Sequence, residues 1–390
     1  MDTHRSLRIL VHCGGSYVSG MEIAALSVMD GLAARGHTVR CVANAWNDSD
    51  FPERLDEAGI PYDELHLGKV SASLSPKYLW WSLNALAHLP LARYRYRRIL
   101  DRFDPDLVLF YGFDAAPLLR FLHDDVPVAF HVQELPEGSR KLAGVLDRHP
   151  DALYIAISEY IADRLRVLGV ENSQIRVVHN GIFVDDVFDG HTPSSTVRTQ
   201  PPFHVGIVGQ VGEWKGHEDL IDAIGLLDDD ITERILCHVV GSGDAPFVNQ
   251  MKERARQQGL SDKIRWHGYV HTMADVYENL DMLVVPSRHG EPFGLVAAEA
   301  GLWKTPVIAS NSGGLPEIIE DGETGFLVPE EDPAAIADRL HTLLTSPDLR
   351  REMGEAAHDR VTDHFTAEAM VNGVHEALVE LAQQSHSAPT

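Results

Sequence analysis

Apolar and polar residues follow a repeating order along the chain: a short apolar run, a turn with glycine, then apolar residues at helical spacing. Leu7–Cys13 is the first apolar run and ends at Gly14-Gly15, after which helical spacing continues over 20–35. Gly36 ends that stretch as a glycine at a helix C-terminus does. Strands that alternate with helices predict βαβ units in a parallel sheet.

The same order predicts elements through most of the chain. In the first half we expect further strands at Thr38–Ala43, Asp106–Tyr111, Val126–Val132, Ala152–Ile157 and Ile175–Val178. In the second half we expect strands at His204–Val208, Ile235–Val240, Lys263–His267, Met282–Pro286, Pro306–Ser310 and Gly325–Val328. Helices are expected between the strands, and one long helix at 76–103 should break or kink at Pro90.

Residues 190–202 interrupt this order, because Pro, Ser and Thr crowd there without a periodic apolar face, as is typical of a linker. The sequence therefore predicts an α/β protein with two doubly wound parallel-sheet domains, at 1–190 and 203–365, and a linker at 191–202. Ligands of open α/β sheets bind beyond the carboxyl ends of the strands. Two such domains facing each other would hold a cleft between those ends.

The chain is strongly acidic, with a formal net charge of -25, and the acidic excess is larger in its second half. This charge disfavours sequence-independent binding to nucleic acid, whose phosphates would repel it. Cys13, Cys41 and Cys237 sit in apolar runs, so we expect small buried residues in a reducing compartment rather than disulfides. No apolar run reaches the ~18–20 residues of a membrane span and no secretory pattern is present, which favours a cytoplasmic protein.

Gly14 and Gly15 lie between a predicted strand and a predicted helix. Glycines in this place let backbone N–H groups approach an anion at the helix N-terminus, whereas a tight turn without a ligand is the alternative. A dinucleotide site is disfavoured, because the pattern is not G-x-G-x-x-G and the second strand ends in Ala43-Asn44 rather than in an acid.

A second glycine-rich loop, Gly209–Gly216 (GQVGEWKG), ends the first strand of the second domain and leads into a helix. It carries Lys215, and a lysine beside a helix N-terminus is a phosphate-binding arrangement. The alternative is an ordinary exposed lysine. A Walker A loop is excluded, because no Lys-Ser or Lys-Thr follows the last glycine.

The third feature is the segment Ser287–Ala300, in which Pro292 suits the first turn of a helix. Glu291 and Glu299 are eight positions apart, which is about 12 Å along a helix. Paired glycosidase carboxyls lie roughly 5–9.5 Å apart, so these two suit the ends of a long ligand better than one scissile bond. The backbone N–H groups of Phe293, Gly294 and Leu295 would then face phosphate. The alternative is one solvated and one structural acid.

Together these motifs resemble the retaining glycosyltransferases of family 4, which have the GT-B fold. The resemblance spans the chain and rests on these segments in this order: Gly14-Gly15, Arg35-Gly36-His37, Asn180-Gly181-Ile182, Val240–Gly243, Arg265–Val270, Glu291 with Glu299, and Ser312–Glu317. Each motif is weak alone, but their order and spacing are specific. The resemblance implies two Rossmann-like domains facing across a cleft, with a closing helix at 366–390 that crosses back onto the first domain.

The resemblance also implies an activity: a hexose moves from a UDP-, GDP- or dTDP-sugar, with retention and without a metal ion. The acceptor would be a hydroxyl of a glycan, a lipid-linked saccharide or a small metabolite. The roles implied are Lys215 on the diphosphate, Glu299 on the ribose, Glu291, Phe293 and Gly294 on the sugar, Tyr269 and Val270 at the base, Gly14 and Gly15 on the diphosphate, and His131 near the transferred sugar. A core histidine is the alternative for His131, and no protein nucleophile is assigned.

Gln210 departs from the family, which usually has Arg directly after the loop glycine. Gln supplies neither a charge nor a bidentate fork, so one diphosphate contact is weaker or Arg288 supplies it. Two other functions stay open: a GT-B sugar-nucleotide epimerase, because the same fold also carries that chemistry, and a degenerate, non-catalytic transferase subunit, to which Gln210 points. The presence of Lys215, Glu291 and Glu299 argues against the second of these.

Residues 77–102 mix aromatic and basic side chains, which suits contact with an anionic membrane surface at the inner membrane face. These residues are Trp80, Trp81, Tyr94 and Tyr96 with Lys77, Arg93, Arg95, Arg97, Arg98 and Arg102. The alternative, which the pattern favours, is an ordinary helix with a basic outer side and an apolar inner side.

Overall fold

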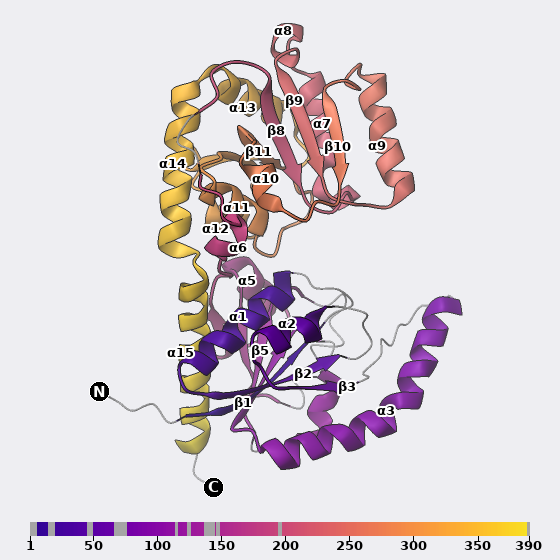
Figure 1. The fold of residues 1–390 in the computed structure, drawn as a ribbon, viewed down its shortest axis with the longest axis vertical. Coiled ribbons are helices and arrows are strands. Elements are labelled where there is room, and N and C mark those ends of the chain that lie inside the picture. The colour runs from indigo at the N-terminus through magenta and orange to yellow at the C-terminus, as the bar shows by residue number, and fades with distance from the viewer. Residues whose placement is uncertain are drawn as a thin grey trace. The chain divides into compact units, whose positions relative to one another are not determined.

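The computed structural model describes residues 6–14, 20–44, 50–65, 76–113, 116–122, 126–135, 145, 149–193 and 197–387. The chain forms two compact units (Figure 1). Unit 1 comprises Met1–Gly181 with Ala367–Thr390, and unit 2 comprises Ile182–Thr366. The boundary therefore falls before the predicted linker. Within unit 2, Arg198 Nε lies 3.1 Å from Asp281 Oδ2, which ties the end of that segment to the unit.

Unit 1 is built on a seven-stranded sheet in the order β3-β2-β1-β4-β5-β6-β7, and each strand pair is parallel. The strands are β1 (Arg8–Cys13), β2 (Thr38–Asn44), β3 (Tyr62–Leu65), β4 (Leu107–Tyr111), β5 (Val128–Val132), β6 (Leu153–Ala156) and β7 (Ile175–Val177). The chain runs outward from β1 to β3 and then returns to β4 on the other side of β1. This reversal is typical of a doubly wound sheet.

The helices of unit 1 include the last long helix of the chain, α15. They are α1 (Gly20–Ala34), α2 (Phe51–Glu57), α3 (Pro76–Phe103), α5 (Glu159–Val167) and α15 (Ala367–Ser387), with short 3₁₀ turns η1 (Ala116–Phe121) and η2 (Asn172–Gln174). Helix α15 packs closely on α1, because a Cβ on Gly31 would lie 2.4 Å from Val371 Cγ1. Helix α3 bends along its length, and Pro90 lies inside it.

The sequence did not predict β3 and α2. Strand β3 is four residues long, lies at the edge of the sheet and buries only Leu65 fully. An edge strand with one solvated side carries too little apolar patterning to be recognised. Helix α2 buries Phe51 and Leu55 alone, so it also lacks the longer apolar stripe on which a prediction could rest.

Unit 2 has a six-stranded sheet in the order β10-β9-β8-β11-β12-β13, again with parallel pairs. Its strands are β8 (Phe203–Val208), β9 (Ile235–Val240), β10 (Ile264–Gly268), β11 (Met282–Val285), β12 (Val307–Ser310) and β13 (Gly325–Val328). Its helices are α6 (Val184–Phe188), η3 (Glu213–Lys215), α7 (His217–Gly225), α8 (Asp229–Thr232), α9 (Ala245–Gln257), α10 (Met273–Tyr277), α11 (Leu295–Leu302), α12 (Leu315–Ile318), α13 (Pro333–Thr345) and α14 (Pro347–His364). The predicted fold class, two Rossmann-like parallel-sheet domains, is confirmed.

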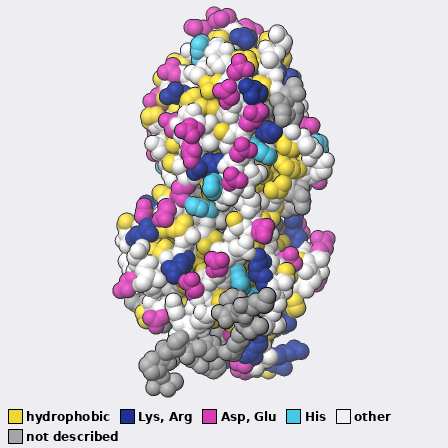
Figure 2. Space-filling view, turned by 90° about the vertical axis from the view of Figure 1, so that its left-hand side faces the viewer, with side chains coloured by type: hydrophobic (Ala, Val, Ile, Leu, Met, Phe, Trp, Pro, Cys, Tyr) yellow, Lys and Arg dark blue, Asp and Glu magenta, His cyan; other side chains and the backbone are white. Residues whose placement is uncertain are grey.

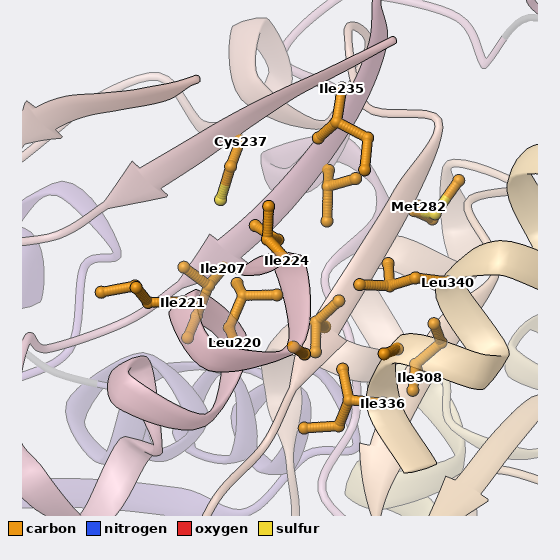
Figure 3. Close-up of a cluster of buried hydrophobic side chains, with 14 of the residues drawn as sticks. Ile207, Leu220, Ile221, Ile224, Ile235, Cys237, Met282, Ile308, Ile336 and Leu340 are labelled. Carbon is orange, nitrogen blue, oxygen red and sulfur yellow. The ribbon is translucent and has the colours of Figure 1, made fainter. Parts of the chain in front are cut away.

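One face of the unit 2 sheet forms the core with α7 and α13 (Figure 3). Alternate strand residues point into it, for example Ile235 and Cys237 on β9, as the period of two in a strand requires. Helix α7 contributes Leu220 and Ile224, which lie one turn apart. Burial of this apolar face fixes the strand register, and the register in turn fixes where each strand ends.

All three cysteines are free and buried, as the sequence predicts. On the face drawn in Figure 2, acidic side chains are dispersed among basic ones rather than gathered into one area. No helix in the described part of the chain is both long and apolar enough to cross a membrane.

Helix α14 makes a close backbone contact that yields a test of the packing. A Cβ on Gly354 would lie 2.0 Å from the carbonyl oxygen of Lys304, which follows α11. We expect Gly354→Ala to destabilise unit 2 by about 1–3 kcal/mol in denaturant unfolding, because the helix must move away. Glu352→Ala, an exposed site on α14, is the control. An unchanged or raised stability of Gly354→Ala would contradict this packing.

Candidate functional site

The unit 2 sheet reverses its strand order between β8 and β11, which are neighbours in the sheet. The loops that follow these two strands leave the same carboxyl edge, where ligands of open α/β sheets bind. The loop after β8 carries Lys215, and the loop after β11 carries Glu291. The fold thus brings together two predicted site residues that are 76 positions apart.

Lys215 and Glu291 form a hydrogen-bonded ion pair. Lys215 Nζ donates to Glu291 Oε1 at 2.5 Å, and Ser287 Oγ donates to the same oxygen at 2.5 Å. The side chains of Lys215 and Glu291 are 20% and 13% exposed, so solvent screens this pair less than a surface pair. Since both donors meet Oε1, the other carboxylate oxygen and two ammonium hydrogens can meet a ligand.

Glycines shape the backbone on both sides of Lys215. Gly209, with φ 133°, directly follows β8, and a Cβ there would lie 3.9 Å from Lys215 Nζ. Gly216, with φ 67°, passes so close to β11 that a Cβ would lie 1.9 Å from the carbonyl oxygen of Pro286. Both conformations favour glycine, and the Lys215 loop can therefore lie against the end of β11.

The structure places Arg288 in an ion-pair cluster with helix α7. Its Nε and one terminal nitrogen donate to the two carboxylate oxygens of Asp219, each at 2.7 Å, and its other terminal nitrogen pairs with Glu218. The sequence offered Arg288 as a replacement for the missing Arg at Gln210, but its guanidinium is occupied by two carboxylates. Gln210 itself is exposed on the loop.

Helix α11 begins later than the sequence predicts. Gly294 is its N-cap, with φ 110°, so Glu291 and Pro292 lie in the preceding loop and not in a first helical turn. That loop is held by Gly314, whose N–H donates to the Glu291 carbonyl at 2.8 Å. The expected spacing of about 12 Å for two glutamates on one helix therefore does not apply. Phe293 is buried, and the N–H of Leu295 opens the helix.

Glu299 lies on α11 and is hydrogen-bonded by Tyr277, whose hydroxyl donates to Glu299 Oε2 at 2.7 Å. The residue as a whole is of intermediate burial. Surrounding protein atoms desolvate its carboxylate and raise its pKa to about 7, although the Tyr277 hydrogen bond acts in the opposite direction. Near neutral pH this carboxyl can exist in either protonation state. No hydrogen bond joins Glu299 to Glu291 among the described residues.

Tyr269 and Val270 follow β10, the strand at the edge of the unit 2 sheet. The side chain of Tyr269 is 71% exposed, and its ring meets His271 edge-on with the centroids 4.8 Å apart. The backbone groups of Tyr269 and Val270 therefore belong to an open loop at the carboxyl edge of the sheet.

In unit 1, Gly14 ends β1 with φ 129°, and a Cβ there would lie 3.1 Å from Asn44 N at the end of β2. The close approach of these two strand ends explains this glycine without a ligand. The predicted partner Gly15 lies outside the described residues.

His131 is fully buried near the end of β5, and desolvation lowers its pKa to about 3, so the imidazole is neutral at pH 7. Its Nδ1 lies 3.3 Å from Gln133 Nε2, and its Nε2 has no hydrogen-bond partner in the part of the chain that the structure describes. Gln133 is in turn held by Asn180 through two amide hydrogen bonds of 3.0 and 2.8 Å. The imidazole is therefore oriented and electrically neutral.

The sequence pattern assigned no role to the side chains that pair with or orient the candidate residues: Ser287, Tyr277 and Asp219 in unit 2, and Gln133 and Asn180 in unit 1. Ser287 begins the segment Ser287–Ala300 that the sequence pattern indicates, so its position after the strand could have identified it. Tyr277 lies far from Glu299 in sequence, and only the fold brings them together. In the described ranges, no group of three or more His, Cys, Asp or Glu side chains could hold a metal ion.

Two family models match the chain. The model described as Glycosyl transferases group 1 matches residues 193–360, and the model described as Glycosyltransferase Family 4 matches residues 18–186. Together they cover nearly all of the two sheets. The chain belongs to the family 4 glycosyltransferases.

Individual relatives agree with this family. A D-inositol 3-phosphate glycosyltransferase of Streptomyces bingchenggensis is 34% identical over 233 residues, which are 56% of this chain and 50% of that protein. The enzyme of the same name from Corynebacterium jeikeium is 31% identical, over 64% of this chain and 62% of that protein. The chain thus spans half to three fifths of the length of these curated relatives.

Solved structures share the fold of this family member. A crystal structure of Anabaena HepE in complex with UDP and glucose has a TM-score of 0.76 at 19% identity, over 95% of this chain and 99% of that one. At this identity the likeness establishes the fold.

The raised pKa of Glu299 makes a testable contribution to stability. Because the folded-state pKa of about 7 lies above the ordinary 4.5, the folded protein binds more protons in that interval, and stability falls as pH rises through it. Glu299→Gln removes the ionisation but keeps an acceptor for Tyr277. We expect the melting temperature of the variant, relative to wild type, to rise from about pH 5 to about pH 8.

The exposed Glu352→Gln, which also replaces one glutamate by glutamine, is the control for this experiment. A Glu299→Gln difference that is flat, or that falls with rising pH, would show that Glu299 ionises normally.

Proposed function

We propose that this chain is a retaining glycosyltransferase that moves a hexose from a nucleoside-diphosphate sugar to an acceptor hydroxyl. The observation that carries the proposal is the Lys215–Glu291 ion pair at the strand-order reversal of unit 2, in a member of family 4. UDP is the first nucleotide to test, because the similar fold of HepE holds UDP and glucose.

In this reaction the bond between the anomeric carbon and the diphosphate oxygen breaks, and a bond to the acceptor oxygen forms on the same face of the sugar. The acceptor loses its proton, and the nucleoside diphosphate leaves with the bonding electrons. Negative charge therefore grows on the diphosphate in the transition state. The Lys215 ammonium and the N–H groups that open α11 are the donors proposed to stabilise it, so that no metal ion is required.

Glu291 is proposed to hold the sugar. Its Oε1 already accepts two hydrogen bonds, and its other carboxylate oxygen can accept from a sugar hydroxyl. The neighbouring N–H groups of Phe293 and Gly294 complete this set. Glu299 is proposed to accept from the ribose hydroxyls, and the backbone of Tyr269 and Val270 to meet the base.

His131 and the N–H of Gly14 are the unit 1 groups proposed to take part in transfer. His131 suits a neutral hydrogen-bonding role, because burial keeps its imidazole uncharged and its Nε2 has no partner among the described residues. Gly15 is included in this proposal only because of the resemblance to the family 4 enzymes.

The acceptor is proposed to be a glycan, a lipid-linked saccharide or a small metabolite. The names of the curated relatives make a phosphorylated inositol the first small molecule to test. Such an acceptor would bring a second anion to the protein.

The site makes a direct prediction for activity. We expect Lys215→Ala to lower kcat roughly 100- to 1000-fold, since a single charge-stabilising donor is commonly worth that much. Glu291→Gln should weaken transfer while leaving the melting temperature close to wild type. Transfer is measured as nucleoside diphosphate released, with UDP-, GDP-, ADP-, CDP- and dTDP-sugars and a panel of acceptors.

Lys263→Ala is the matched control, because Lys263 also pairs with a glutamate, Glu233, at 2.6 Å but lies elsewhere in unit 2. Full activity of Lys215→Ala would refute the site. Consumption of the donor without any acceptor would favour an epimerase or a hydrolase. A bound nucleotide at 100 times its Kd should raise the free energy of unfolding of the wild type by roughly 2.7 kcal/mol. If no nucleotide stabilises the wild type, a non-catalytic subunit is favoured.

We further propose that the protein is cytoplasmic and contacts an anionic membrane through α3. The described outer side chains of this helix include Leu91 and Tyr94, which are 49% and 59% exposed. At 3.6 residues per turn they share one side of the helix with Arg95, Arg98 and Arg102, opposite the buried side chains.

These three arginines form no ion pair with the described residues, so their charge is available to lipid phosphates. An anionic surface attracts such a cluster, and an exposed Tyr and Leu suit the interface. Side chains at 76–86, including Lys77, Trp80 and Trp81, lie outside the described part.

The membrane proposal predicts flotation with vesicles of phosphatidylcholine and phosphatidylglycerol, and none with phosphatidylcholine alone. An arginine near such a surface contributes about 1 kcal/mol, so replacing Arg95, Arg98 and Arg102 by Gln should weaken partitioning roughly a hundredfold. The control replaces three arginines elsewhere whose side chains are 37–47% exposed, Arg166, Arg176 and Arg351, with the same change of net charge. Equal loss in both variants, or no flotation of the wild type, would end the proposal.

A further inference from the structure

We propose that Arg288 is a positioning residue that holds the Lys215 loop against the end of β11, and that it does not bind the donor. The inference rests on the proposed function, because it assigns the placement of Lys215 for charge stabilisation to a second side chain. It starts from the contacts that Arg288 makes in unit 2.

The first contact is a two-pronged ion pair with α7. Arg288 Nε meets Asp219 Oδ2 and a terminal nitrogen meets Asp219 Oδ1, each at 2.7 Å, in the parallel geometry in which guanidinium and carboxylate bind most strongly. The side chain of Asp219 is 3% exposed and that of Arg288 is 18% exposed. The pair therefore fixes α7 to the loop after β11 with little screening by water.

The second contact is made by the backbone of the same residue. The N–H of Arg288 donates to the carbonyl of Trp214 at 2.8 Å. Gly216 lies so close to the Pro286 carbonyl that a Cβ there would come within 1.9 Å of its oxygen. Lys215 is the residue between Trp214 and Gly216, so both of its chain neighbours are tied to the end of β11.

The charge balance also separates Arg288 from the donor. Its guanidinium faces Asp219 and, through its remaining terminal nitrogen, Glu218. Glu218 also meets Arg254, whose guanidinium pairs with Asp222. Three carboxylates on two guanidiniums leave this cluster with a net negative charge, which does not attract a diphosphate. Breaking the pair of Arg288 with Asp219 would leave the buried carboxylate of Asp219 without its partner, which is costly.

The two roles of Arg288 predict opposite effects of a change at Asp219. If Arg288 positions the loop, Asp219→Asn loosens the same contact as Arg288→Gln, and both variants lose activity. If instead Arg288 binds phosphate, Asp219→Asn releases it, and affinity for the nucleoside diphosphate stays equal or rises. A double-mutant cycle separates the two roles.

The experiment measures kcat and KM for transfer, with the donor to which the wild type responds, for Arg288→Gln, Asp219→Asn, the double variant and Arg288→Lys. We expect each single variant to lower kcat roughly ten- to a hundredfold with little change in KM, because a misplaced Lys215 acts mainly in the transition state. The double variant should be no worse than either single one. Arg288→Lys should not restore kcat, since lysine lacks the fork.

Arg254→Gln is the matched control. Arg254 makes a similar fork to Asp222 on α7, with Nε donating to Oδ1 at 2.7 Å. A terminal nitrogen of Arg254 also lies 3.7 Å from Glu218, but Arg254 contacts neither Asp219 nor the Lys215 loop among the described residues. Its kcat should equal that of the wild type. The double variant replaces the ion pair with two neutral amides, so it also serves where a single variant with one unpaired charge fails to fold.

A second measurement is independent of activity: amide hydrogen exchange of Lys215 and Gly216, whose N–H groups donate to Gly212 and Glu213. We expect these two amides to exchange faster in Arg288→Gln and Asp219→Asn than in the wild type. Their exchange rate in Arg254→Gln should equal that of the wild type. Faster exchange in a chain that transfers no sugar would keep the positioning role and refute the proposed function. Normal kcat in Arg288→Gln, tighter nucleotide binding in Asp219→Asn, or unchanged exchange would each overturn the positioning role.

Discussion

The ion pair between Lys215 and Glu291 is the interaction on which the rest of the site depends. It joins two loops that meet only because β8 and β11 are neighbours at the reversal of strand order. A core of alternating apolar residues fixes the register of those strands, and the register fixes the height at which each loop leaves the sheet. The chemistry of the loops is thus a consequence of packing on the other side of the strands.

Close backbone approach is the second constraint, and it explains the glycines better than a ligand does. Gly216 and Gly313 adopt positive φ and lie where a Cβ would come within 1.9 Å of the Pro286 carbonyl or 2.4 Å of the Glu291 N–H nitrogen. Gly14 follows the same rule in unit 1, beside Asn44. In this chain these glycines therefore allow loop to pack closely against loop.

The sequence predicted both sheets and most of their strands, because a buried parallel strand is an unbroken apolar run that glycine and polar residues delimit. It missed β3 and α2, whose apolar sides are too short to give a pattern. In the site, spacing identified Lys215 and the two glutamates but not their partners. The pairing of Tyr277 with Glu299, and of Arg288 with Asp219, depends on which helix covers which strand end, and no local pattern carries that information.

The contacts of Arg288 also change how the departure at Gln210 is understood. With Gln210 uncharged and Arg288 neutralised by acids, positive charge at this edge rests on Lys215, whose own partner is Glu291. A lysine already held by a carboxylate needs little reorganisation when an anion arrives, since its position is set before binding. If Lys215 stabilises the leaving diphosphate as proposed, the rigidity of its loop matters to transfer as well as its charge.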